Sequence, residues 1–189
     1  MLQEQQLGEL LTVLNTGGII LYPTDTIWGI GCDATNARAV EKVYNVKERI
    51  SDKSFIIIVK DQEMLRNYVT FIPDIVIELL ASVSEPLTVI YPGGKNLPKN
   101  VISSDGSIAI RIPDHAFCQQ LLGAFGKPLI STSANISGGP LPYSFRSIDE
   151  QIKQSVDYIV PLEQNTIARP KPSTIVKIDN DAEIRILRN

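Results

Sequence analysis

Hydrophobic and polar positions along the chain switch repeatedly between the spacing of a helix and that of a strand. Residues 3–16 place four leucines on one helical face, and a glycine pair follows as a stop signal. Helical spacing predicts helices at 3–16, 36–46, 61–68, 73–81, 114–125 and 146–154. Short β-rich apolar runs predict strands at 19–22, 55–59, 87–91, 107–111, 129–130, 157–160, 173–178 and 183–187. This alternation indicates an α/β protein with an open, twisted, mixed sheet flanked by helices.

The length and charge of the chain favour one domain that binds small ligands. With 189 residues, the chain suits a single domain over residues 1–189. Lys and Arg number 18 and Asp and Glu number 21, so the net charge is −3. A mildly acidic protein has no overall field that attracts a long polyanion, so this balance favours a small anionic ligand.

Cysteine usage and the absence of targeting signals point to the cytoplasm. Cys32 and Cys118 form no CxxC spacing, so no metal site is expected. We predict two buried free thiols rather than a disulfide, as is usual in a reducing compartment. The N-terminal segment lacks the features of a signal peptide, and the longest apolar run, residues 55–59, is too short for a membrane helix. We therefore expect a cytoplasmic protein without membrane contact.

Polar residues gather at two places in the first third of the chain. Residues 23–29 read Pro-Thr-Asp-Thr-Ile-Trp-Gly and can grip the polar groups of an amino acid, although this segment alone is more typical of a turn that satisfies its own backbone. The cations Lys47, Arg49 and Lys53 precede the strand predicted at 55–59 and can neutralise phosphates. Taken alone, they are more typical of a solvated helix end.

Two further clusters follow predicted strands in the second half of the chain. Residues 131–139 contain four hydroxyls, an amide and two glycines, and we interpret this segment as part of a ligand site because it directly follows a core strand. Arg111 ends another strand and can clamp a carboxylate. The alternative is an exposed arginine that pairs with a nearby acid. The single histidine, His115, is assigned no chemistry.

Motifs of several common enzyme classes do not occur in the sequence. There is no Walker A motif, no GxGxxG after a strand and no HExxH. There is also no GxSxG elbow and no evident Cys–His pair. A P-loop enzyme, a Rossmann cofactor site, a zinc protease and a serine hydrolase are therefore all disfavoured.

Four motifs occur in an order and spacing that resemble the YrdC family across nearly the whole chain. They read YPTDTIWGIGCD at 22–33, KERxxxKS at 47–54, SIAIRIPDH at 107–115 and KPLISTSANISG at 127–138. The resemblance implies an α/β open twisted sheet around a large concave cleft. It also implies the activity of the family's enzymatic members, which join L-threonine, bicarbonate and ATP into threonylcarbamoyl-AMP and pyrophosphate for the threonylcarbamoyladenosine modification of tRNA.

The resemblance assigns roles to matching positions of this chain. The residues implied to bind threonine are Thr26, Arg111, Ser131 and Ser173. Those implied to bind ATP are Arg49, Lys53, Ser107, Ser133, Asn135, Leu141 and Arg188. Lys47 and Arg49 are expected to carry catalysis at the phosphates, with Mg²⁺ bridging the phosphate oxygens. The expected partners are the three substrates, downstream tRNA threonylcarbamoyl-transfer proteins and, as an open question, RNA.

Two other functions compete with the synthase. One is an RNA-binding module that uses the basic residues Lys47, Arg49, Lys53, Lys95 and Lys99. The other is an inactive YciO-like relative, although the K-x-R and S-A-N patterns of this chain favour an active enzyme. Two segments depart from the family pattern. Residues 84–88 read Ser-Glu-Pro-Leu-Thr in place of W-P-G-P-x-T, and Arg188-Asn189 stands where many members continue with Pro-Gly.

Overall fold

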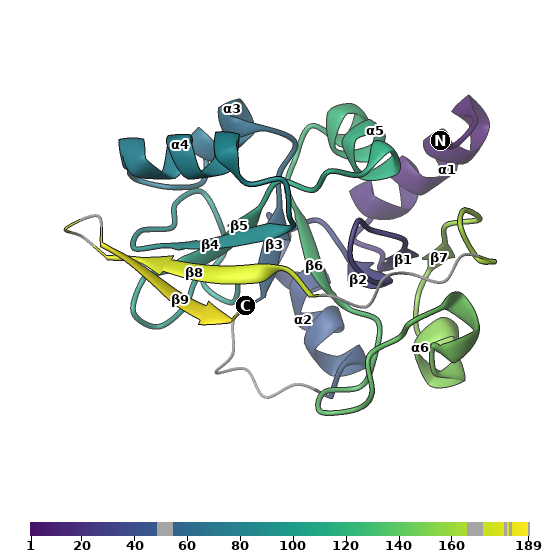
Figure 1. Ribbon diagram of the computed structural model, residues 1–189. Coiled ribbons are helices and arrows are strands. Elements are labelled where there is room, and N and C mark those ends of the chain that lie inside the picture. Colours follow the sequence, from purple (N-terminus) through teal and green to yellow (C-terminus); the bar gives the residue numbers. More distant parts are fainter. Residues whose placement is uncertain (49–54, 166–171, 180, 182, 189) are drawn as a thin grey trace.

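The computed structural model describes residues 1–48, 55–165, 172–179, 181 and 183–188, which form a mixed sheet with helices packed against it (Figure 1). In this part of the chain the sheet has nine strands in the order β7-β1-β2-β6-β3-β5-β4-β8-β9. The strands are β1 Ile20–Tyr22, β2 Gly29–Gly31, β3 Ile56–Ile58, β4 Leu87–Tyr91, β5 Ile108–Arg111, β6 Leu129–Ser133, β7 Tyr158–Ile159, β8 Thr174–Ile178 and β9 Ile184–Arg188. Parallel and antiparallel pairs both occur, as the α/β prediction required.

Five of the six helices in the described part of the chain begin and end within two residues of the predicted positions, and α6 does not. They are α1 Glu4–Asn15, α2 Ala37–Val46, α3 Gln62–Arg66, α4 Asp74–Ser82, α5 Ala116–Phe125 and α6 Glu150–Gln154. Asn36 caps α2 by accepting hydrogen bonds from the backbone N–H groups of Arg38 and Ala39. Gly126 ends α5 with a φ of 71°, a left-handed conformation that glycine adopts without strain.

The two faces of the sheet carry different core clusters because successive side chains of a strand point to opposite faces. Ile57, Ile110 and Ile130 belong to the larger cluster, to which α2, α3, α4 and α6 contribute. Ile58 and Leu129 belong to the smaller cluster with α1 and α5, which lie side by side (Figure 1). The smaller cluster covers only part of its face.

The uncovered part of that second face is the row of residues next to the one that contains Ile58. Ile56 pairs with Ser131 on one side and with Ala109 on the other, one row further along the strands than Ile58. These three side chains share a face with Ile58, because they stand two residues from it or from its partners. This row forms the floor of the cavity described below.

Three local predictions were wrong. Strand β2 was missed because its Gly-Ile-Gly sequence gives no strand signal, but a Cβ atom on Gly31 would lie 2.3 Å from the carbonyl oxygen of Ile130. Strand β6 continues to Ser133, so the hydroxyls predicted in a loop lie partly on a strand. The helix predicted at 146–154 is a 3₁₀ turn, Phe145–Ser147, followed by the shorter α6.

The cysteine prediction is confirmed, since Cys32 and Cys118 are both free and buried. Burial raises the pKa of each thiol, so both stay protonated at neutral pH and behave as small apolar side chains. No helix among the described residues is long and apolar enough to cross a membrane.

Candidate active site

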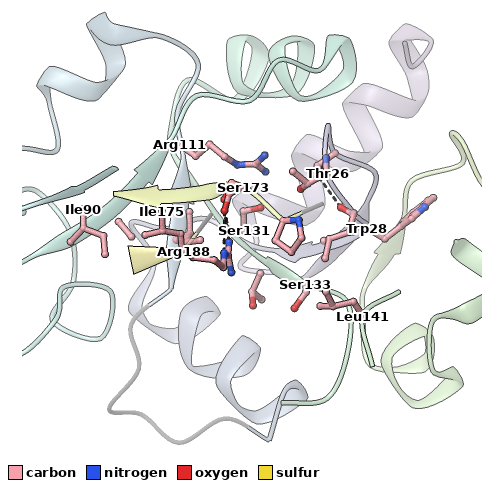
Figure 2. A pocket seen from close by; sticks show the side chains of 17 residues that line it. Thr26, Trp28, Ile90, Arg111, Ser131, Ser133, Leu141, Ser173, Ile175 and Arg188 are labelled. Atoms are coloured by element: carbon pink, nitrogen blue, oxygen red, sulfur yellow. Dashed lines mark hydrogen bonds between the residues drawn. The ribbon is translucent and has the colours of Figure 1, made fainter. Parts of the chain in front are cut away.

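A cavity of about 390 Å³ opens over the uncovered row of the sheet (Figure 2). Apolar side chains of β3, β4, β5 and β8 form its floor, and polar side chains from separate segments surround them. The lining residues are Thr24, Thr26, Ile27, Trp28, Gly29, Ile56, Ile90, Ala109, Arg111, Ser131, Thr132, Ser133, Leu141, Pro172, Ser173, Ile175 and Arg188. A mostly apolar hollow with a few convergent polar groups is typical of a small-molecule site.

The loop between β1 and β2 supplies one wall of the cavity. The Thr24 hydroxyl donates to the carbonyl of Ile27 at 2.7 Å and accepts from the backbone N–H of Thr26 at 3.1 Å. The Thr26 hydroxyl lies 3.0 Å from that of Thr24 and reaches the cavity. The turn interpretation is confirmed for Thr24, which satisfies the backbone. Thr26 faces the hollow, and the binding interpretation stays a prediction.

Arg111 projects from the end of β5 into the cavity (Figure 2). Its Nη1 donates to Oδ1 of Asp25 at 2.6 Å, and the two side chains are only 5% and 10% exposed. The other carboxylate oxygen of Asp25 accepts from the backbone N–H of Asp114 at 3.3 Å. Arg111 is thus a buried cation with an acidic partner. It differs from both alternatives considered above, an arginine without a partner that binds a ligand carboxylate and an exposed arginine that pairs with a nearby acid.

Arg188 reaches the cavity from the edge strand β9 (Figure 2). Its Nη2 donates to the backbone carbonyl of Ser173 at 2.8 Å and to the Ser173 hydroxyl at 3.3 Å. That hydroxyl also lies 2.7 Å from Oγ1 of Thr88. Burial first, and then the charge of Arg111, lowers the pKa of Arg188, so the two cations share one electrostatic environment.

Lys47 is not among the residues that line the cavity, but it holds one wall of the cavity in place. Lys47 is 2% exposed, and its ammonium donates to the backbone carbonyls of Ser133 and Asn135, the latter at 2.6 Å. The Asn135 side chain in turn donates to the carbonyl of Gly139 at 2.8 Å. These bonds fix the segment that carries Ser133 and Leu141, both of which line the cavity.

The structure brings together seven of the residues predicted from sequence. These are Thr26, Arg111, Ser131, Ser133, Leu141, Ser173 and Arg188. Lys47, Asn135 and Ser107 are not among the lining residues, and Ser107 donates instead to Asp105 at 2.6 Å. Arg49 and Lys53 lie outside the described residues. The described part of the chain contains no group of three His, Cys, Asp or Glu side chains that could hold a metal ion.

Sequence reasoning missed two kinds of site residue. The apolar floor, which includes Ile56, Ala109 and Ile90, was read as core only. The alternation of strand residues could have placed Ala109 beside Arg111, since positions two apart share a face. Trp28 also lines the cavity and contacts Phe145, with the two rings tilted by 52° and their centroids 5.0 Å apart.

A family model described as "Sua5_yciO_yrdC: Telomere recombination" matches residues 12–189. The chain belongs to the Sua5/YciO/YrdC family. Within this family, threonylcarbamoyl-AMP synthase of Pseudoalteromonas translucida is 36% identical over 93% of this chain and 94% of its own length. A protein of the same name from Vibrio parahaemolyticus is 34% identical over 88% of this chain and 91% of its own.

Solved structures of this family share the fold. P. abyssi Sua5 in complex with L-threonine superposes with a TM-score of 0.89 at 25% identity. The alignment covers 100% of this chain but 55% of that one, so this chain spans about half the length of that relative. E. coli YciO, 23% identical, superposes with a TM-score of 0.85 over 99% of this chain and 90% of its own, which confirms the predicted fold.

Proposed function

We propose that this chain is a threonylcarbamoyl-AMP synthase, which forms threonylcarbamoyl-AMP and pyrophosphate from L-threonine, bicarbonate and ATP. The observation that carries the proposal is the agreement between the curated relatives, which bear this name across about nine-tenths of the chain, and a cavity where two arginines face short alcohols. A triphosphate and an amino acid are both anionic at their binding ends, and guanidinium groups bind such oxygens with charge-assisted hydrogen bonds.

Threonine would occupy the end of the cavity near Arg111. The free N–H groups of Arg111 would bind its carboxylate, and the hydroxyls of Thr26, Ser131 and Ser173 would surround its polar groups. Polar side chains in this wall are held in place before a ligand arrives, since Thr26 and Ser173 each contact a second hydroxyl at 3.0 and 2.7 Å. The complex of P. abyssi Sua5 with L-threonine supports an amino acid site in a protein of this fold.

ATP would occupy the end near Ser133, Leu141 and Arg188. Arg49 and Lys53 are proposed to add charge to the phosphates, as the sequence predicts. We propose for Lys47 that it acts by fixing the 133–141 segment, because its ammonium bonds the carbonyls of that segment. Any Mg²⁺ would be held mainly by phosphate oxygens and water, which is how this ion is usually bound with nucleotides.

The chemistry forms a C–N bond and an O–P bond, breaks the bond between the α-phosphorus and pyrophosphate, and releases water, because bicarbonate loses hydroxide and the amine loses a proton. The threonine amine adds to CO₂ derived from bicarbonate and loses a proton, which leaves a carbamate. A carbamate oxygen then attacks the α-phosphorus of ATP, and the bond to pyrophosphate breaks. The protein would contribute orientation of the reactants, which is worth roughly 7–11 kcal/mol in well-aligned systems, and cations near the developing charge. The product would pass to the proteins that transfer the group to tRNA.

A direct assay tests the proposal. The purified protein is incubated with ATP, labelled bicarbonate and L-threonine, and pyrophosphate and labelled threonylcarbamoyl-AMP are both measured. We expect the two products in equal amounts. Valine is the matched control substrate, because it has the shape of threonine without the hydroxyl, and it should react at least about 100-fold less well if the alcohols recognise that hydroxyl. Pyrophosphate release that does not depend on threonine would reject the function.

A further inference from the structure

Asp25 lies outside the lining of the candidate active site but bonds a residue that belongs to it. Its carboxylate lines a second cavity, of about 700 Å³, together with residues of the 60–62, 83–87 and 112–114 segments. Arg111, its partner at 2.6 Å, lines the first cavity. The ion pair therefore lies in the wall between the two hollows, with its negative end on one side and its positive end on the other.

The bond to Asp25 holds the far end of a side chain whose near end is already fixed. The backbone of Arg111 pairs with Ile58 of β3 and Thr88 of β4. Among the residues that the structure describes, Asp25 is the only group to which the guanidinium donates. A guanidinium has five N–H donors in a rigid plane, so one contact fixes its orientation and leaves the other donors for a ligand.

Asp25 itself is held in place by its second oxygen. That oxygen accepts the backbone N–H of Asp114, which lies three residues beyond Arg111 along the same segment. The carboxylate is 10% exposed, so little water competes for these bonds. Its charge also offsets one of the two cations, Arg111 and Arg188, that line the first cavity.

We infer that Asp25 is a positioning residue, which fixes the Arg111 guanidinium in the orientation that binds the carboxylate of the amino acid substrate. The inference rests on the proposed function. Asp25 acts through Arg111, because it is not among the residues that line the first cavity. Its removal should leave Arg111 charged but free to rotate. Threonine would then bind more weakly because the guanidinium is no longer oriented in advance, while the reaction at the ATP phosphates would be unaffected.

Steady-state kinetics of pyrophosphate release test this role. The variants are Asp25→Ala and Asp25→Asn, with Asp114→Ala as the matched control. Asp114 is exposed, carries the same charge and borders the same second cavity, and its backbone N–H remains in the variant. For Asp25→Ala we expect the KM for threonine to rise by roughly 30-fold while the KM for ATP changes less than about twofold, because only the threonine end loses its alignment.

The conservative variant and a double variant separate positioning from general damage to the fold. Asp25→Asn keeps an oxygen that accepts from Arg111, so its KM for threonine should rise by no more than about fivefold. If Asp25→Ala fails to fold, this variant carries the test. Its amide NH₂ cannot accept from the backbone N–H of Asp114, so its KM for threonine should rise about two- to fivefold with the KM for ATP unchanged, and an unchanged KM for threonine would overturn the inference. Adding Asp25→Ala to Arg111→Ala should raise the KM for threonine no further, because the two residues act as one unit.

Three results would overturn the inference. These are an unchanged KM for threonine in Asp25→Ala, a parallel rise of both KM values, and an equal effect of Asp114→Ala. Wild-type protein without threonine-dependent pyrophosphate release would instead reject the proposed function, so the two failures are distinguishable.

Discussion

The two arginines of the cavity differ in how the fold holds them. Arg111 lies on an inner strand and is 5% exposed, and an acidic partner fixes its guanidinium. Arg188 lies on the edge strand β9, is more exposed than Arg111, and bonds the carbonyl and hydroxyl of Ser173. A register shift at Ile175–Val176 accompanies the pairing of Arg188 with Ile175, and bulges of this kind re-aim side chains beside functional sites.

This difference indicates unequal contributions to binding. A buried, aligned cation binds an anion with little loss of side-chain freedom and little competition from water. An exposed cation is screened by salt and solvent, and its net contribution is smaller. The fold therefore provides a rigid end near Arg111, which suits a small amino acid, and a more adaptable end near Arg188, which suits a nucleotide.

The largest effect is expected from Arg111→Ala. Truncation of this side chain leaves Asp25 as an unpaired buried charge, which should cost about 3–5 kcal/mol in the free energy of unfolding. The kcat/KM for threonine should fall on the order of 100-fold, since the carboxylate loses a charge-assisted contact. Urea denaturation measures the first quantity and pyrophosphate release the second.

The double variant Arg111→Ala, Asp25→Ala separates these two losses. It removes both charges, so much of the stability should return while the affinity for threonine stays low. Full recovery of threonine affinity in the double variant would contradict the assignment of Arg111 to the carboxylate.

A smaller effect is expected from Arg188→Ala. The KM for ATP should rise roughly tenfold, as for the loss of one partly exposed hydrogen bond to a charged group, and the free energy of unfolding should change little. Arg185→Ala is the matched control, because Arg185 lies on the same strand, is 71% exposed, and has acidic neighbours at 3.8 and 3.9 Å. An equal change in both variants would mean that Arg188 acts only through the surface charge of β9.

The smallest effect is expected from Ser107→Ala. The family resemblance placed Ser107 at the nucleotide end, but its hydroxyl donates to Asp105, so the KM for ATP should stay within about twofold of wild type. A tenfold rise in that KM would instead support a nucleotide contact for Ser107.

The same variant has a defined dependence of stability on pH. Hydrogen bonds from the Ser107 side chain and backbone, and then from Lys177, lower the pKa of Asp105 to about 2. A lowered pKa in the folded state stabilises the protein above the unfolded value of 3.8, and the gain is lost as the pH falls from 3.8 to about 2. The stability difference between Ser107→Ala and wild type should therefore be seen at pH 5–7 and shrink over that acidic range, as followed by thermal unfolding.

Most of the elements of the fold could be predicted because their signals are local. The leucines of residues 3–16, the Asn36 cap and the glycine at 126 each act within one helix, and the helices predicted at 3–16, 36–46 and 114–125 were confirmed. Strand β2 escaped prediction because Gly31 is required by the close approach of the Ile130 carbonyl of β6, which is about 100 residues away in sequence.

The sequence by itself determined the α/β class, the family and the types of side chain available for chemistry, since these follow from periodicity and from motifs in a fixed order. Only the tertiary structure decided which of those side chains share a hollow. Arg111 meets Asp25 and Lys47 meets Ser133 across 86 residues in each case. Such partners are chosen by the register and twist of the sheet, because a shift of one residue would turn each strand side chain to the opposite face.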